Sequence, residues 1–251
     1  MRRMALHFTL LAGCGWLAGA APQVLGEVDK QPPPVREQLA KHGILSDRQS
    51  LLGALKSRDA EVRTLAAIRL GEYDLDAMRG DSIPALAEAL RTETDPAVAS
   101  LIAAVLGGLG DLRGDRVLEK MCHDSAIGPR TKLQVARFLV GLKSENCVGD
   151  VLDLAFKGDD SVTAGVFDFL PRFQPFERIS SEDQVRIIEI IRRGLSDPSP
   201  HMRLVASDVR GRMKDESAAA DLQRAIDAES DAHVRDSMRR ALIALQKRTP
   251  Q

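Results

Sequence analysis

Hydrophobic residues recur along most of the chain in one helical register. When the valine of a repeated turn, or the Thr or Met that replaces it in two copies, is taken as position zero, the residues at positions four and eleven are hydrophobic in all six copies. Positions zero, four, eight and eleven form one face of a helix with 3.6 residues per turn. The position-eleven residues follow one another at intervals of 31 to 40, so the pattern is an internal repeat. The residues at position zero are Val62, Val98, Thr131, Val162, Met202 and Val234.

A second set of helices is expected between these segments. Ser46 and Ser181 begin two of them at capping-box spacing, with Gln49 and Gln184 three residues later. No segment of the sequence has the period-two alternation of a half-buried strand, so the sequence predicts an all-α fold in which antiparallel helix pairs stack into a solenoid. The expected intervening helices cover about 47–56, 82–92, 115–123, 147–156, 182–194 and 217–227.

The turn inside each repeat carries a resemblance to a known family. Residues 55–63 read LKSRDAEVR and residues 195–203 read LSDPSPHMR, each followed by a helical segment. This pattern resembles HEAT repeats, and more narrowly the short bacterial HEAT-like repeats of the phycobilisome-lyase type. The resemblance covers 46–247 and is weak in the third copy, where 123–130 read HDSAIGPR and the Asp and Val are missing from their places in the pattern. It implies a right-handed α-solenoid of about six repeats whose second helices line a concave protein-binding surface, and it implies no reaction.

The N-terminal segment is typical of an export signal. Arg2 and Arg3 precede an uncharged stretch, rich in Ala, Gly and Leu, that extends to Pro22. Two cleavage sites are open. Small residues precede Ala21, whereas the Leu-Ala-Gly before Cys14 resembles a lipobox, in which the cysteine is acylated. The sequence therefore predicts export to the bacterial periplasm or cell envelope, either as a secreted protein or as a lipoprotein anchored through Cys14.

These features divide the chain into three parts. A signal sequence is expected over 1–20 (1–13 in a lipoprotein), a Pro-rich tether with a short capping helix over 21–45, and the HEAT-like repeat domain over 46–247. In the 251 residues, 35 Lys and Arg balance 36 Asp and Glu, for a formal net charge of −1. This balance excludes a general attraction to nucleic acid, because phosphate neutralisation dominates that binding. A membrane is expected to be contacted only through the signal or a lipid on Cys14.

The recurring acidic and basic residues of the turns are interpreted as structural. An Asp before a helix caps its N–H groups, and an Arg one turn into the helix is expected to bridge to the neighbouring repeat's Asp. Because the pairs recur with the repeat period, they are not predicted to be catalytic. They are Asp59 with Arg63, Asp197 with Arg203 and Asp231 with Arg235.

No cofactor or metal site is predicted. HEAT-like deoxyhypusine hydroxylases bind iron through His-Glu dipeptides, and none of the five histidines here is followed by Glu. Cys122 and Cys147 are expected near opposite ends of parallel helices, separated by more than the 7 Å or so between Cα atoms that a disulfide tolerates. They are therefore predicted to be two free thiols.

Two surfaces are candidate protein-binding sites. Position six of the repeat points away from the hydrophobic face and becomes charged along the chain, at Arg137, Asp168, Asp208 and Arg240. The second candidate is the Phe- and Pro-rich stretch 169–178, with Arg172 and Phe176. It is either an exposed recognition loop or a hydrophobic plug, and both interpretations remain open.

The sequence thus predicts a non-enzymatic scaffold or adaptor in the bacterial cell envelope that presents a concave repeat surface to a protein partner. One alternative is a lyase-like or cofactor-attachment factor, as in the phycobilisome-lyase relatives. A purely structural spacer is a third possibility. The sequence does not identify the partner.

Overall fold

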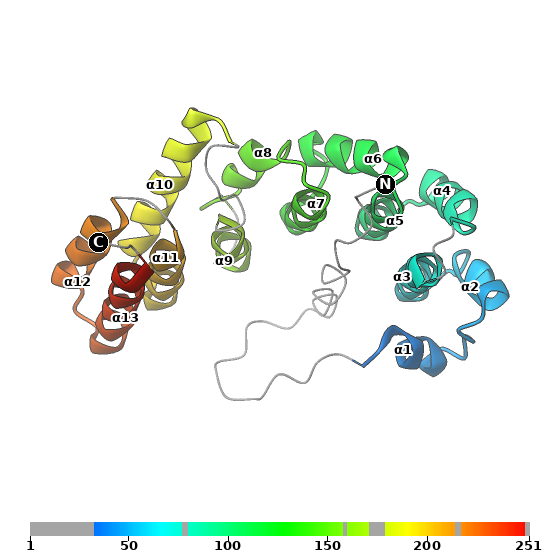
Figure 1. The fold of residues 1–251 in the computed structure, drawn as a ribbon, viewed down its shortest axis with the longest axis horizontal. Helices are drawn as coiled ribbons and strands as arrows, with labels where there is room; N and C mark the ends of the chain where they lie inside the picture. Colours follow the sequence, from blue (N-terminus) through cyan, green and yellow to red (C-terminus); the bar gives the residue numbers. More distant parts are fainter. Residues whose placement is uncertain (1–32, 77–79, 158–159, 171–178, 214–216, 249–251) are drawn as a thin grey trace. The chain divides into compact units, whose positions relative to one another are not determined.

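All regular elements of the described residues are α-helices (Figure 1). The helices belong to two compact units that divide between Ser144 and Glu145. Within the described part of the chain, none of the helices combines the length and the apolar character needed to cross a lipid bilayer. This computed structural model describes residues 33–76, 80–157, 160–170, 179–213 and 217–248.

In the first unit, every second helix belongs to one packed row. Helices α1, α3, α5 and α7 contact one another in that order, and α2, α4 and α6 each pack against the helix that follows (Figure 1). The helices are α1 (Val35–Lys41), α2 (Arg48–Ala54), α3 (Ala60–Asp76), α4 (Ile83–Thr92), α5 (Pro96–Gly108), α6 (Leu112–His123) and α7 (Pro129–Gly141).

The second unit has the same alternation. Helix α11 packs between α9 and α13, while α10 contacts α8 and α12, and the pairs α10–α11 and α12–α13 join these two rows. The helices are α8 (Val148–Leu152), α9 (Asp160–Phe169), α10 (Ser181–Leu195), α11 (Pro200–Arg212), α12 (Ala218–Ala228) and α13 (Ala232–Arg248).

The hydrophobic register predicted from the sequence is the one that the core uses. All six position-four residues are fully buried, which confirms the face chosen for each second helix. Position eleven is less uniform, since Tyr73 is partly exposed, its ring lies under the Arg69 guanidinium and its hydroxyl donates to the Ser46 carbonyl at 2.7 Å. The position-four residues are Ala66, Ile102, Val135, Val166, Ala206 and Met238.

Most of the expected intervening helices lie within a few residues of the observed ones, with one clear exception. Helix α8 has five residues, whereas the sequence predicted a helix over 147–156. The expected capping helix over 35–42 corresponds to α1, which ends just before Gly43. Gly43 has a φ of 70°, in the left-handed region where glycine is favoured, so it stops the helix as expected.

The prediction of two free thiols is wrong. Cys122 and Cys147 are both disulfide-bonded and both buried. The prediction assumed that Cys147 begins a full-length helix parallel to the one that contains Cys122. Because Cys147 instead precedes the short α8, the separation calculated for full-length helices does not apply.

Candidate functional site

An arginine one turn into α3 connects two successive turns of the first unit. Arg63 donates from Nε and Nη2 to the two carboxylate oxygens of Glu93, at 2.7 and 2.9 Å. Its Nη1 donates to the carbonyls of Ser57 and Arg58 in the preceding turn, at 2.9 and 3.1 Å. Both side chains of the ion pair are largely buried, and Glu93 is 4% exposed. We call this arrangement a clamp.

The clamp keeps its glutamate ionised. Burial alone acts to raise the pKa of Glu93, but hydrogen bonds from Arg63 and from the backbone N–H of Asp95, together with the charge of Arg63, outweigh it. The net effect is that the pKa of Glu93 lies below its usual value. The backbone N–H of Thr94 also donates to this carboxylate, at 3.0 Å, so Glu93 organises the turn that leads into α5.

The second unit contains the same clamp. Arg203 donates to both oxygens of Glu229 at 2.7 and 3.0 Å, and its Nη1 donates to the carbonyls of Asp197 and Pro198 at 2.8 and 2.9 Å. The hydrogen bond from Arg203 is the main cause that lowers the pKa of Glu229.

The bridge expected between Arg and the next repeat's Asp is therefore wrong, because the acceptor is a Glu two residues earlier. The predicted capping role is confirmed for two of the three Asp residues: Asp59 accepts from the N–H of Glu61, and Asp231 accepts from the N–H groups of His233 and Val234. The sequence feature from which the clamp could have been predicted is Glu-x-Asp, which occurs at 93–95 and again at 229–231.

Sequence reasoning also missed a buried ion pair in the second unit. Arg210 occupies position eight, where the other five copies have leucine, and its side chain is 0% exposed. Its Nε and Nη2 donate to Asp221 Oδ2 at 3.0 and 2.6 Å, and Nη2 also reaches the Ser217 hydroxyl. Arg192 and Arg224 pair with the same carboxylate from more exposed positions. A charged residue at a repeat position that is otherwise apolar was the sequence feature that could have revealed this ion pair.

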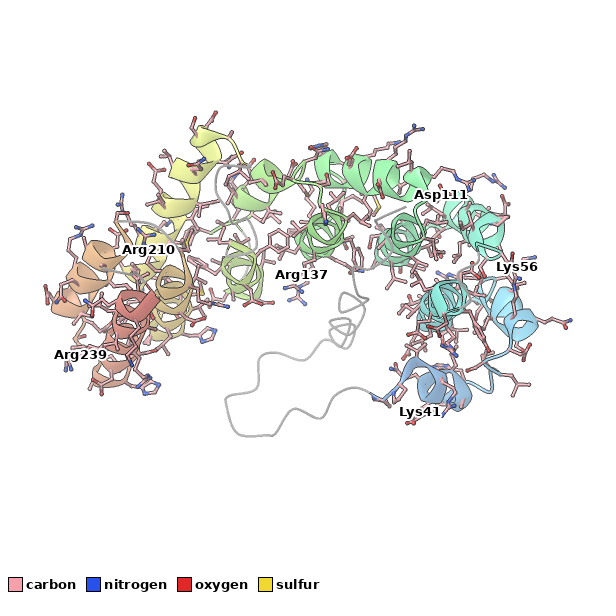
Figure 2. The ribbon with its side chains drawn as sticks, viewed as in Figure 1. Lys41, Lys56, Asp111, Arg137, Arg210 and Arg239 are labelled. Atoms are coloured by element: carbon pink, nitrogen blue, oxygen red, sulfur yellow. The ribbon has the colours of Figure 1, made fainter. Side chains whose placement is uncertain are left out.

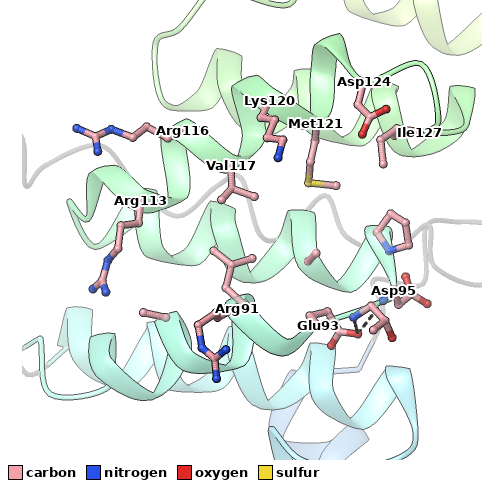
Figure 3. A pocket seen from close by; sticks show the side chains of 15 residues that line it. Arg91, Glu93, Asp95, Arg113, Arg116, Val117, Lys120, Met121, Asp124 and Ile127 are labelled. Atoms are coloured by element: carbon pink, nitrogen blue, oxygen red, sulfur yellow. Dashed lines mark hydrogen bonds between the residues drawn. The ribbon is translucent and has the colours of Figure 1, made fainter.

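The first unit also contains a groove between α4, the start of α5 and α6, with a volume of about 660 Å³ (Figure 3). Its apolar side chains other than exposed Pro96 are partly or largely buried, and Val117 and Met121 extend from α6 towards the space between the helices. We call it the α4–α6 groove. Its apolar lining consists of Ala87, Leu90, Pro96, Ala99, Val117, Met121 and Ile127.

The carboxylates around the groove are engaged within the protein. Glu93 belongs to the clamp, Asp95 caps α5, and Asp124 accepts from the N–H of Ala126 at 2.8 Å. In contrast, Arg116 and Lys120 on α6 are exposed and have no hydrogen-bond or ion-pair partner among the described residues. Asp95 and Asp124 keep their negative charge but are bound by N–H groups of their own turns, so the ionisable groups at the groove that have no partner in the described part of the chain are the cations Arg116 and Lys120.

Two other cations at the groove are already paired. Arg91 binds Glu88 and Arg113 binds Asp111, each through more than one nitrogen. Arg116 and Lys120 are therefore the two cations at the groove that can pair with a carboxylate of a ligand.

No protein-family model matches the chain, and no curated protein shows significant similarity to it. What the groove can bind therefore follows from its own side chains. It offers an apolar floor and two uncompensated cations, a combination suited to a polypeptide segment with an apolar side chain and a carboxylate. Cys122 lies on α6 as well, but its sulfur is in a disulfide and does not provide a thiolate for a metal or a cofactor.

The residues of the predicted concave surface lie outside this groove. Arg137 is half-buried and extends from α7 on the side opposite α6 (Figure 2). In the second unit Asp168, Asp208 and Arg240 are exposed, and Asp208 pairs with Arg212 of the same helix at 2.6 Å.

Position six is not a surface position throughout, because Ile68 in α3 is only 3% exposed. The described residues do not include Arg172, Phe176 or Cys14, so the choice between a loop and a plug at 169–178 and the lipidation of Cys14 stay predictions.

Proposed function

We propose that this protein is a non-enzymatic scaffold of about six HEAT-like helix pairs that binds a protein partner in the bacterial cell envelope. The single observation that carries the proposal is the α4–α6 groove, with its apolar floor and two uncompensated cations. The packed rows of helices in each unit are consistent with stacked repeats. The recurring Arg and Glu residues serve the clamps that tie successive turns together, which is a structural use of the ionisable groups.

The groove favours a polypeptide ligand with mixed chemistry. Burying an apolar side chain against Leu90, Val117 and Met121 would supply affinity, because each fully buried aliphatic side chain is worth about 1.5–3 kcal/mol. A carboxylate beside that side chain would pair with Arg116 or Lys120 and fix the orientation of the segment. Position-six residues such as Arg137 and Arg240 remain predicted contacts on a second surface.

Export remains part of the proposal. Disulfides persist mainly in oxidising compartments such as the bacterial periplasm, so the disulfide-bonded state of Cys122 and Cys147 supports it. The two cleavage alternatives differ in a measurable way. Mass spectrometry of the mature N-terminus distinguishes an acylated Cys14 from an unmodified Ala21.

The test is site-specific photo-crosslinking in the bacterium that makes the protein. A photoreactive amino acid at position 117 lies in the groove, and one at exposed position 185 on α10 serves as the matched control. We expect one protein to crosslink at position 117 and not at 185. The crosslink should be lost in the charge-reversed variant Arg116→Glu/Lys120→Glu.

Two results would reject the groove as the binding site. One is the same crosslinked species from both positions, and the other is a crosslink at 117 that survives the charge reversal. A pigment or other small molecule that copurifies with the chain, in place of a crosslinked protein, would favour the cofactor-attachment alternative.

A further inference from the structure

Helix α13 carries a third clamp that is only half occupied. Arg235 donates from Nη1 to the carbonyl of Glu229, six residues earlier, at 2.9 Å. This matches the bonds from Arg63 to Ser57 and from Arg203 to Asp197, which also span six residues. In the two complete clamps Nε and Nη2 hold a glutamate, whereas those nitrogens of Arg235 have no such partner in the described part of the chain.

A second feature shows which side of α13 the open clamp faces. Position nine of the repeat is Gly71 in α3 and Gly211 in α11. A Cβ added to Gly71 would lie 2.6 Å from Val105 of α5, and one added to Gly211 would lie 2.8 Å from Ala241 of α13. At Gly107 in α5, the third glycine at this position, an added Cβ would meet Asp115 of α6 and Leu142 just after α7, so position nine faces the next helix pair. In α13 this position is Ile243, which is 50% exposed.

Arg235 and Ile243 thus share one face of α13, which we call the α13 outer face. Ile243 follows Arg235 by eight residues, which corresponds to about 12 Å along a helix. The chief neighbours of α13 are α11 and α12, whereas α11 packs against helices on both sides. Among the described residues, no further helix pair packs on the outer face in the way that α13 packs on the equivalent face of α11.

The charge of α13 indicates what can bind there. The helix contains Arg235, Arg239, Arg240, Lys247 and Arg248 but only one acidic residue, Asp236, which pairs with Arg239. A second copy of this helix would be repelled. A second copy docked end to end would also lack the acceptor, because the first repeat has Ser57 where the two turns that complete a clamp have Glu93 and Glu229.

We propose that the α13 outer face binds an acidic segment of another protein that presents a glutamate at the end of a helix. The two occupied clamps define this chemistry: the carboxylate receives two hydrogen bonds from the guanidinium, while the N–H groups of its own turn bind its other side. An apolar side chain about 12 Å away would cover Ile243. The α13 outer face shares no residue with the α4–α6 groove, so binding at one of these surfaces can be disproved without affecting the proposal for the other.

The probe is a fluorescent peptide with the chain's own acceptor sequence, residues 223–234, QRAIDAESDAHV. Fluorescence anisotropy measures its binding to the full chain. We expect saturable binding that weakens at least tenfold when the peptide glutamate is replaced by glutamine. Arg235→Gln should cause a similar loss, and combining the two changes should add little, because they remove the same contact.

Further variants separate a local contact from a loss of fold or a general charge effect. Arg235→Lys keeps the charge but loses the planar fork and should also weaken binding, with unchanged helix content by circular dichroism. Ile243→Ser should weaken it through the apolar contact. The control is Arg239→Gln on the same helix, at a position 56% exposed, which should leave binding unchanged.

Three results would overturn the proposal. The first is no binding of the peptide to the unmodified chain. The second is an equal loss in Arg239→Gln, which would mean non-specific charge attraction. The third is concentration-dependent self-association, by analytical ultracentrifugation, that Arg235→Gln abolishes, since the occupant would then be a second copy.

Discussion

Single residues in this protein illustrate how burial decides whether an ion pair stabilises the fold. Arg63 and Glu93 form a two-bond pair with side chains 16% and 4% exposed, whereas Arg91 and Glu88 form a comparable two-bond pair at the surface. Exposed pairs contribute little because water and salt screen them, while breaking a buried pair leaves an uncompensated charge. The chain therefore offers a matched comparison between two Arg–Glu pairs in the same unit.

We predict that Glu93→Gln lowers the free energy of unfolding by about 2 kcal/mol, since a buried, charge-assisted hydrogen-bond pair loses one charge. Glu88→Gln should leave stability unchanged within error. Urea denaturation of both variants, followed by circular dichroism, measures the difference. Equal effects would mean that the clamp is no stronger than a surface pair.

At the level of helices, α5 and α6 of the first unit approach each other closely at Gly114. A Cβ on Gly114 would collide with the carbonyl oxygen of Ala103 and lie 2.6 Å from the backbone nitrogen of Gly107, both in α5. Backbone atoms cannot move aside as a flexible side chain can, so the two helices would have to separate. Glycine at 114 is thus required by packing.

Gly114→Ala is predicted to cost about 3 kcal/mol of unfolding free energy through this overlap. The control is Gly53→Ala in α2, where an added Cβ has no atom within 4 Å. There the higher helix propensity of alanine should stabilise the protein by up to about 1 kcal/mol. Thermal unfolding of the two variants gives opposite shifts of Tm if this account is correct, and the same sign for both would contradict it.

The sequence predicted the helices well because one signal, apolar spacing at 3.6 residues per turn, recurs in almost every repeat. It failed where a local feature departs from the repeat. Helix α8 is half as long as the period suggests, and the disulfide-bonded Cys147 at its start departs from the separation that parallel, regularly stacked helices predicted. Arg210 was overlooked because the pattern assigned its position to the core, and its partner Asp221 lies in the next helix.

Less of the candidate site was predictable than of the fold. The α4–α6 groove is formed by side chains from three helices, and a repeat register reports which residues are buried but not where neighbouring helices leave space. Lys120 and Arg116 become candidates only because the nearby carboxylates turn out to be engaged elsewhere. Which partners these carboxylates bind depends on distances between atoms, and the spacing of hydrophobic residues in the sequence gives no information about those distances.

Across the whole molecule, one clamp in each unit links stability to pH. The pKa values of Glu93 and Glu229 are both lowered in the folded protein. A carboxyl with a lowered pKa contributes stability above its unfolded pKa, about 4.3 for glutamate, and that contribution is lost as the pH falls through the lower, folded pKa. The two clamps should therefore make the protein more sensitive to acid below about pH 4.3.

The double variant Glu93→Gln/Glu229→Gln tests this link, because glutamine does not titrate. At neutral pH the variant should be less stable than the unmodified protein, since it lacks both ion pairs. Below about pH 4.3 the difference should shrink as the native glutamates become protonated and the clamps lose their charge. Chemical denaturation at pH values from about 3 to 7 measures the difference, with Glu88→Gln as the surface control. A difference that stays constant over this range would show that the clamps act through shape and neutral hydrogen bonds rather than through the charge of their glutamates.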